Sequence, residues 1–229
     1  KYGNPAGERL EYFIQEDAHK IDSGSGPEDF VANCIAVFQD RIFVGYTHEA
    51  TDGIKRHRIR WSSATNKRDF SSPDNWLDLP YVQGAIKRLV VLGNTLVAYF
   101  DDAIFIGVPT NNPYLPVAFQ KIETGGIGLV GMKAVVPYLD GHFFVGQDDI
   151  YLLTNRGAEK IGSPVVKRTI AESDYRERIY ATIDPENEQI VFGFTKATRY
   201  MEELWCFNYK SGGWSYWNIM SLMIVNPIV

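Results

Sequence analysis

The feature that most constrains the fold is a short unit that recurs along the chain about every 47 residues. The turn positions of successive units are separated by 53, 47 and 47 residues, at Arg41, Asn94, Gly141 and Glu188. Each turn lies inside an apolar run that it splits in two, at residues 35–46, 88–99, 134–146 and 179–194. Dipeptides such as Asp-Gly and Gly-Asn tolerate the positive φ angles of a tight hairpin, so each run predicts a β-hairpin.

The matches between units extend beyond the turns. When the sequence is shifted by 47 residues, Leu96-Val97 aligns with Phe143-Phe144, and the acidic pair Asp101-Asp102 aligns with Asp148-Asp149. A repeat of 40–50 residues with four strands is typical of a β-propeller blade. The strands expected in three of the units are 88–92, 95–99, 104–108 and 117–122; 134–138, 142–145, 150–154 and 159–161; and 179–183, 189–195, 203–209 and 214–218.

We therefore expect an all-β, propeller-like chain of four-stranded antiparallel modules, with a ring that these residues leave incomplete. The expected organisation is an N-terminal segment or partial first blade at 1–32, repeats at about 33–82, 83–125, 126–171 and 172–219, and the start of a further strand or module at 220–229. The apolar end of the chain and its first residue, Lys1, lead us to expect a piece of a longer protein.

Two stretches depart from the strand pattern. Residues 8–21 fit an amphipathic helix, although 11–15 could equally form a strand of an incomplete module. Residues 164–178 are polar and charged, and we expect a short helix there, between two blades.

Composition excludes some classes of function and selects none. The 229 residues are 45% hydrophobic and 14% aromatic, which is too apolar for a disordered chain. Lys and Arg number 23 against 28 Asp and Glu, and this net charge of -5 argues against a generic binder of nucleic acid. No apolar run approaches the roughly 20 residues of a membrane-spanning helix.

The candidate reactive side chains do not form a catalytic pattern. The two acidic pairs could serve a glycosidase or a metal site, but their recurrence just before an apolar strand favours a turn role. His19, His48, His57 and His142 match no metal-ligand spacing, and His142 is expected at the surface because it follows a turn. The glycine-rich stretch 125–131 is not a phosphate-binding loop, and we expect a crossover between blades. We therefore assign no catalytic, cofactor-binding or metal-binding residues and expect no cofactor.

Cys34 and Cys206 both lie in apolar, strand-like runs. The favoured interpretation is two buried thiols, although a single bridge would form if the fold brought them together.

The basic run at 55–60 is the strongest local charge feature. Contact with phosphate or nucleic acid is one interpretation. The favoured one is a solvated strand edge, with Arg58 and Arg60 outward and Ile59 inward.

The order of several motifs resembles a known family. Residues 58–79 place Arg60-Trp61-Ser62 before a polar loop that ends in Pro73-Asp74-Asn75-Trp76. A hairpin with Tyr99, the glycine-rich stretch, a module at 142–154 and a closing WCFNYKSGGW hairpin at 205–214 follow. This order, over residues 31–218, resembles the β-propeller proteins of tailed-bacteriophage tails and head-to-tail connectors, of the hub, nozzle or stopper type. Ser63 departs from the family's loop pattern, which has aspartate at this position.

The resemblance implies a non-enzymatic structural subunit of the virion, made in the host cytoplasm. It implies a homo-oligomeric ring, usually sixfold, that contacts other tail or connector proteins and through which DNA passes. The tryptophans would pack within the blades, at Trp61, Trp76, Trp205, Trp214 and Trp217. The acidic balance would suit a channel that must release DNA.

Two other classes stay open. A carbohydrate-binding or glycan-degrading propeller would need repeated turns of the Ser-Asp-Gly-Trp type or carboxylates from separate blades. A cellular protein-interaction propeller would show stronger repeat identity, such as recurring Trp-Asp ends.

Overall fold

The computed structural model of the chain describes residues 30–70, 72, 74–80, 83–123, 125–196 and 200–221; the segment expected at 8–21 lies outside them. Over the described residues the chain forms sixteen β-strands, one α-helix and one short 3-10 helix. The strands make four sheets of four strands each, all of them antiparallel meanders in chain order. The expected all-β fold of four-stranded, propeller-like modules is thus confirmed.

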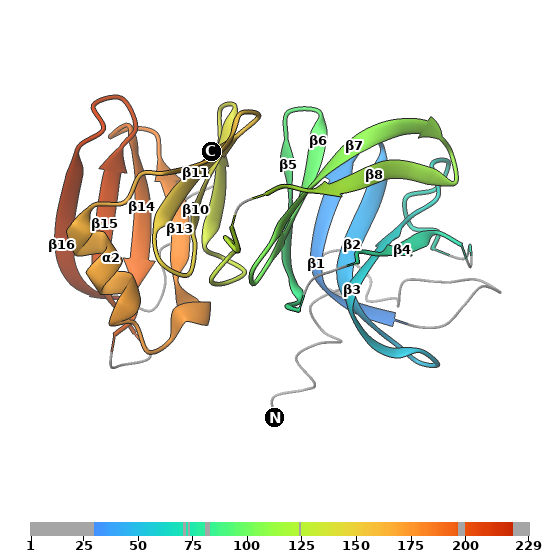
Figure 1. Cartoon of the computed structure of the whole chain (residues 1–229), viewed down its shortest axis with the longest axis horizontal. Coiled ribbons are helices and arrows are strands. Elements are labelled where there is room, and N and C mark those ends of the chain that lie inside the picture. Colours follow the sequence, from blue (N-terminus) through green and yellow to red (C-terminus); the bar gives the residue numbers. More distant parts are fainter. Residues whose placement is uncertain are drawn as a thin grey trace. The chain divides into compact units, whose positions relative to one another are not determined.

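The first compact unit spans Lys1–Ile122 and holds two of the sheets (Figure 1). One consists of β1 (Phe30–Phe38), β2 (Arg41–Glu49), β3 (Gly53–Trp61) and β4 (Trp76–Asp78). The other consists of β5 (Ile86–Leu92), β6 (Thr95–Phe100), β7 (Ile104–Asn112) and β8 (Leu115–Lys121).

Local sequence explains the hairpins of this unit. Gln39 and Asp40 form the two-residue turn between β1 and β2, with φ angles of 46° and 58°. Gly93 has a φ of 56° at the turn between β5 and β6. These residue types adopt left-handed conformations at low cost, so the register of each hairpin is set at its turn.

The core of the first unit lies between its two sheets. Phe43, Ile59 and Trp61 of the first sheet are at most 1% exposed and belong to the same apolar cluster as Leu96 and Phe105 of the second. Burying each large side chain of this kind contributes about 1.5–3 kcal/mol, so this cluster is the main source of the unit's stability.

The second compact unit spans Glu123–Val229 and holds the other two sheets. One consists of β9 (Val135–Tyr138), β10 (Gly141–Val145), β11 (Ile150–Thr154) and β12 (Gly157–Lys160). The other consists of β13 (Tyr180–Asp184), β14 (Gln189–Phe194), β15 (Met201–Asn208) and β16 (Trp214–Ser221).

The short helix expected at 164–178 is confirmed as α2 (Pro164–Ala171), followed by η1 (Arg176–Arg178). Ser163 caps α2 by accepting a hydrogen bond from the Val166 backbone, and Pro164 occupies the first turn, where no backbone donor is needed. Val166 and Ile170 are buried, so α2 docks through one apolar stripe.

Aromatic side chains join the two sheets of the second unit. The rings of Phe143 and Phe207 lie 5.9 Å apart, and those of Tyr138 and Tyr209 lie 4.4 Å apart. Trp214 donates from Nε1 to the Ile161 carbonyl, at 3.2 Å.

The glycine-rich stretch 125–131 forms no helix and belongs to the connection from β8 to β9, as expected of a crossover. Gly125 and Gly126 adopt φ angles of 66° and 88°, which L side chains rarely reach. The described part of the chain contains no helix that is long and apolar enough to cross a membrane.

Candidate functional site

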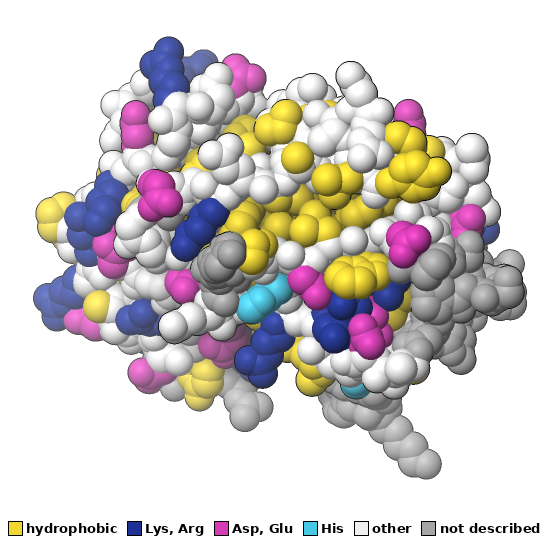
Figure 2. Space-filling view, turned by 45° about the vertical axis from the view of Figure 1, so that its right-hand side comes forward, with side chains coloured by type: hydrophobic (Ala, Val, Ile, Leu, Met, Phe, Trp, Pro, Cys, Tyr) yellow, Lys and Arg dark blue, Asp and Glu magenta, His cyan; other side chains and the backbone are white. Residues whose placement is uncertain are grey.

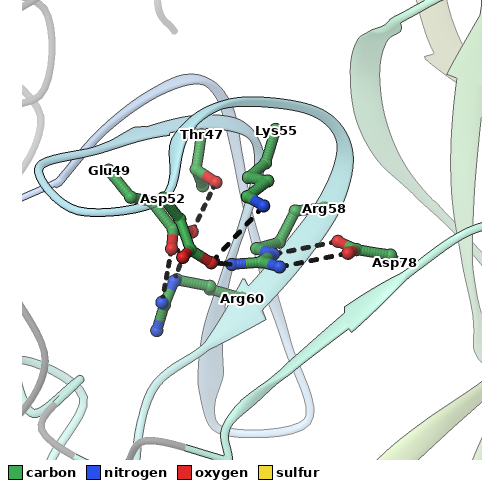
Figure 3. A network of polar contacts seen from close by, with 7 residues as sticks. All are labelled: Thr47, Glu49, Asp52, Lys55, Arg58, Arg60 and Asp78. Atoms are coloured by element: carbon green, nitrogen blue, oxygen red, sulfur yellow. Dashed lines mark hydrogen bonds and ion pairs between the residues drawn. The ribbon is translucent and has the colours of Figure 1, made fainter.

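An extensive charge network lies at one end of the first sheet (Figure 3). It joins the end of β2, the turn that follows, β3 and β4. Its members are Thr47, Glu49, Asp52, Lys55, Arg58, Arg60 and Asp78.

Glu49 and Arg60 form the buried centre of this network. Arg60 donates from Nε to Glu49 Oε1 at 2.9 Å and from Nη2 to Oε2 at 2.8 Å. Thr47 donates its hydroxyl to Glu49 Oε1 at 2.7 Å. The Glu49 side chain is only 2% exposed, so these donors replace the water that the carboxylate has lost.

Arg58 uses three of its nitrogen atoms within the network. Its Nε and Nη2 donate to the two oxygens of Asp78, at 2.9 and 3.1 Å. Its Nη1 donates to Glu49 at 2.8 Å and to Asp52 at 2.9 Å. The Trp76 ring covers the guanidinium, with its centroid 3.8 Å from Cζ, so Arg58 is held on its edges and on one face.

Electrostatics favour the ionised forms of Glu49, Asp52 and Arg58. Burial disfavours the charged form of Glu49, but hydrogen bonds from Arg60 and Thr47 and the charges of Arg60 and Arg58 outweigh it and lower its pKa. The hydrogen bond from Arg58 and the charge of Lys55 lower the pKa of Asp52. For Arg58, burial opposes the charge, yet its bonds to Asp78 and Asp52 raise its pKa. Carboxylates held in this way are poor proton donors or acceptors near neutral pH, so the arrangement favours anchoring of strands over acid–base chemistry.

The expected orientation of the basic run is therefore only partly correct. Ile59 faces the core as expected and is 0% exposed. Arg58 and Arg60 point to the opposite face but are 3% and 4% exposed, so the expectation of a solvated edge is wrong for both. The alternation of side chains along β3 shows which face of the sheet each residue lies on. Whether the face with Arg58 and Arg60 is buried depends on carboxylates from β2 and β4.

Sequence reasoning missed the acidic partners of the two arginines. Glu49 and Asp52 precede the basic run by a few residues. A hairpin between these two residues and Arg58 would bring their carboxylates close to the arginine, so the sequence did hold a usable signal for this part of the network. Asp78 follows Arg58 by 20 residues, and only the pairing of β3 with β4 places it opposite Arg58.

The acidic pairs lie in bends between the second and third strands of their sheets, which confirms the expected turn role. Asp101 accepts from the Ala85 backbone at 2.8 Å and pairs with Lys87 at 2.7 Å. Asp148 accepts from the Tyr151 hydroxyl at 2.5 Å and pairs with Lys160 at 2.8 Å. Asp149, which is fully buried, accepts from the Ile150 backbone at 2.8 Å, and Lys167 lies 2.9 Å from its other oxygen. The carboxylates Asp101, Asp148 and Asp149 thus hold local structure in place.

The histidines do not converge. His142 is 0% exposed, so its expected surface position is wrong: β10 lies between β9 and β11, and its whole length is buried. His48 is exposed, and His57 Nε2 lies 2.7 Å from the Gly84 carbonyl. His19 lies outside the described residues. Among the residues that the structure describes, no three His, Cys, Asp or Glu side chains form a group that could hold a metal ion.

The tryptophans divide into two groups. Trp61 is 1% exposed in the core, and Trp205 and Trp214 are half-buried. Trp76 and Trp217 are 37% and 58% exposed, so their expected role in blade packing is wrong. Trp76 instead covers Arg58, and Trp217 lies on an outer strand.

Cys34 and Cys206 are both buried and free, which confirms the favoured interpretation. Burial raises the pKa of the Cys34 thiol to about 12 and also raises that of Cys206. Neither is therefore a ready nucleophile.

Comparisons with known proteins define the fold without selecting a function. No family model matches the sequence. No curated protein matches it either. In contrast, 107 solved chains match in structure, so the architecture is widely shared.

Two of these solved structures illustrate the likeness. The extracellular domain of a one component system from B. thetaiotaomicron has a TM-score of 0.50 at 10% identity, over 81% of this chain. Raptor from Chaetomium thermophilum has a TM-score of 0.51 at 14% identity, over 84% of this chain. The match spans only 22% and 16% of those two proteins. At such identities the likeness concerns the fold alone.

Proposed function

We propose that the chain is a structural part of a phage tail or head-to-tail connector subunit, which joins a homo-oligomeric ring around the genome channel. In this proposal it is not an enzyme. Its partners are further copies of itself and other tail or connector proteins, and it resides in the virion.

One observation carries the proposal: the motifs that resemble the phage family build the sheets. Arg60 and Trp61 end β3, and the polar loop after them returns to Trp76, the first residue of β4. Arg60 is bound to Glu49, Trp61 fills the core, and Trp76 covers Arg58. Side chains with these contacts support a rigid scaffold.

The charge distribution agrees with a surface that does not retain DNA. On the face drawn in Figure 2, Lys and Arg side chains lie among Asp and Glu side chains and do not form a basic field. Together with the net charge of -5, this mixture gives phosphates little to bind.

A symmetric reconstruction of the purified full chain by electron microscopy tests the proposal. We expect a closed ring, sixfold as in the family, with a lumen that is neutral or acidic. A lumen dominated by Lys and Arg would contradict the channel role. A chain that stays monomeric and hydrolyses glycans would contradict the structural role as well.

The contacts of the acidic pairs disfavour the glycan-degrading alternative. A glycosidase needs one carboxylate that is free to donate a proton and another that is free to attack or to activate water. Asp101 and Asp148 are instead paired with Lys87 and Lys160. Assay of the full chain against glycans provides the direct measurement.

A further inference from the structure

The outer edge of the last sheet differs from the outer edges of the other three. The inner strands of each unit lie beside one another, β1 beside β5 and β9 beside β13. The outer strands are β4, β8, β12 and β16, and among the described residues no further strand pairs with them. Open edges of this kind promote unwanted pairing unless short length, charge or proline protects them.

Three of the four outer strands carry such protection. β4 has three residues and ends in Asp78. β8 contains Pro116 and ends in Lys121. β12 has four residues and ends in Glu159 and Lys160.

β16 has none of these features. It has eight residues, WSYWNIMS, without a charge or a proline. Tyr216 is 44% exposed and Trp217 is 58% exposed, and because they are adjacent on a strand they lie on opposite faces of the sheet. Strand addition would cover both aromatic side chains.

The hydrogen-bond pattern shows which backbone groups of β16 point outward. The Asn208 backbone donates to the Gly213 carbonyl at 2.9 Å, so these two residues form a hydrogen-bonded pair. Such pairs alternate along an antiparallel ladder, which makes Ser215 and Trp217 the next residues bonded to β15. The backbone groups of Trp214, Tyr216 and Asn218 therefore point away from β15, to the open edge.

We propose that β16 pairs antiparallel with β16 of a second copy of this chain, across a two-fold axis. The partner strand should also lack charge, since a charged side chain opposite these aromatics would be desolvated without a counterion. Among the outer strands that the structure describes, β16 alone meets this requirement. The two sheets then join into one, and the Trp217 side chains gain cross-strand neighbours on one face, as do the Tyr216 side chains on the other.

This contact is isologous and stands apart from the heterologous contacts that close a ring. It goes beyond the proposed function and does not depend on it. A contact made chiefly by two strands is small beside a standard interface, so we expect a weak, concentration-dependent dimer.

Analytical ultracentrifugation of the full chain over a range of concentrations tests the inference. Asn218→Pro removes an outward donor and leaves the bonds to β15 in place, so we expect the dissociation constant of the dimer to rise at least about tenfold. Ala158→Pro is the matched control, because the pairing of Ile161 with Ile150 directs the Ala158 backbone to the open edge of β12. This control should leave the dimer unchanged.

Hydrogen exchange gives a second, residue-specific measurement on the unmodified chain. The Tyr216 and Asn218 amides should become protected as concentration rises, while the Ala158 amide should not. If Asn218→Pro fails to fold, Tyr216→Lys introduces a charge at the same edge and should give the same loss.

A chain that remains monomeric at about 100 μM, far above a typical micromolar dissociation constant, contradicts the inference. So does a dimer that Asn218→Pro and Tyr216→Lys both leave intact. A larger ring in which the Tyr216 and Asn218 amides stay unprotected would also contradict it, while leaving the proposed function standing.

Discussion

At the scale of single residues, Glu49 organises the end of the first sheet. Its two carboxylate oxygens accept hydrogen bonds from Arg58, Arg60 and Thr47. Glu49 is thus the buried anion between two buried guanidinium groups. A buried ion pair of this kind does not guarantee net stability, but loss of one partner leaves an uncompensated charge in the interior.

We therefore predict that Glu49→Gln lowers the free energy of unfolding by about 3–5 kcal/mol, because Arg58 and Arg60 stay buried with less counter-charge. Denaturant titration followed by circular dichroism measures the loss. Asp40→Asn is the control, since the Lys67–Asp40 pair is 50% and 88% exposed, and it should cost no more than about 1 kcal/mol. Equal losses in the two variants would rule out the anchoring role of Glu49.

The same residue sets part of the response to acid. Its pKa is lowered below the ordinary value of 4.5 in the folded chain, so its contribution to stability is complete above pH 4.5 and is lost as pH falls through the folded pKa. Asp148 and Asp184 have lowered pKa values as well, so Glu49 accounts for only a part of the loss. Thermal melting between pH 3 and 7 should show a shallower decline for Glu49→Gln than for the parent, and identical slopes would contradict this prediction.

At the scale of elements, side-chain size decides how closely neighbouring strands pack. A Cβ atom added to Gly107 on β7 would lie 2.5 Å from a Val117 methyl carbon, 2.6 Å from a Phe119 ring carbon and 2.8 Å from the Leu96 carbonyl oxygen. Strands β6 and β8 thus leave no room at this point of β7, and a backbone oxygen cannot move aside as a side chain can.

Gly107→Ala should therefore destabilise the chain by about 1–3 kcal/mol through overpacking. Gly213→Ala is the matched control, because its added Cβ would meet only the Ser211 hydroxyl, at 3.4 Å. Denaturant titration of both variants compares their free energies of unfolding. If Gly107→Ala left this free energy unchanged, the β7–β8 hairpin would be able to shift at little cost.

At the scale of the whole molecule, the chain divides into two compact units at Ile122 and Glu123. Each unit has two sheets and apolar side chains between them. Glu123 is exposed, and so are Gly125 and Gly126, two glycines with positive φ. Exposed connections of this kind are the usual sites of proteolytic cleavage.

Among the described residues, a glutamate-specific protease should cut first after Glu123. Mass spectrometry of a time course should show fragments of 123 and 106 residues before any cut within a sheet. Circular dichroism of the digested sample should retain its β signal. Earlier cleavage at Glu159 or Glu172 would show that the second unit opens more readily than the connection.

Much of this architecture could be predicted from the sequence because its causes are local. The hairpins at 88–99 and 134–146 have turn residues at their centres, and alternation assigns Ile59 to the core. The turn role of the acidic pairs follows from their local sequence in the same way. The pairing of Asp78 with Arg58 could not be predicted, since it forms only when β4 pairs with β3.

The sequence by itself determined the repeat and the strand order within each module, because turn chemistry and period-two alternation act over a few residues. Only the tertiary structure decided which polar side chains are buried. Arg58, Arg60 and His142 look exposed in a local pattern, yet neighbouring strands cover all three. Burial depends on what packs over a side chain, and those neighbours lie on other strands, outside the few residues that set the local pattern.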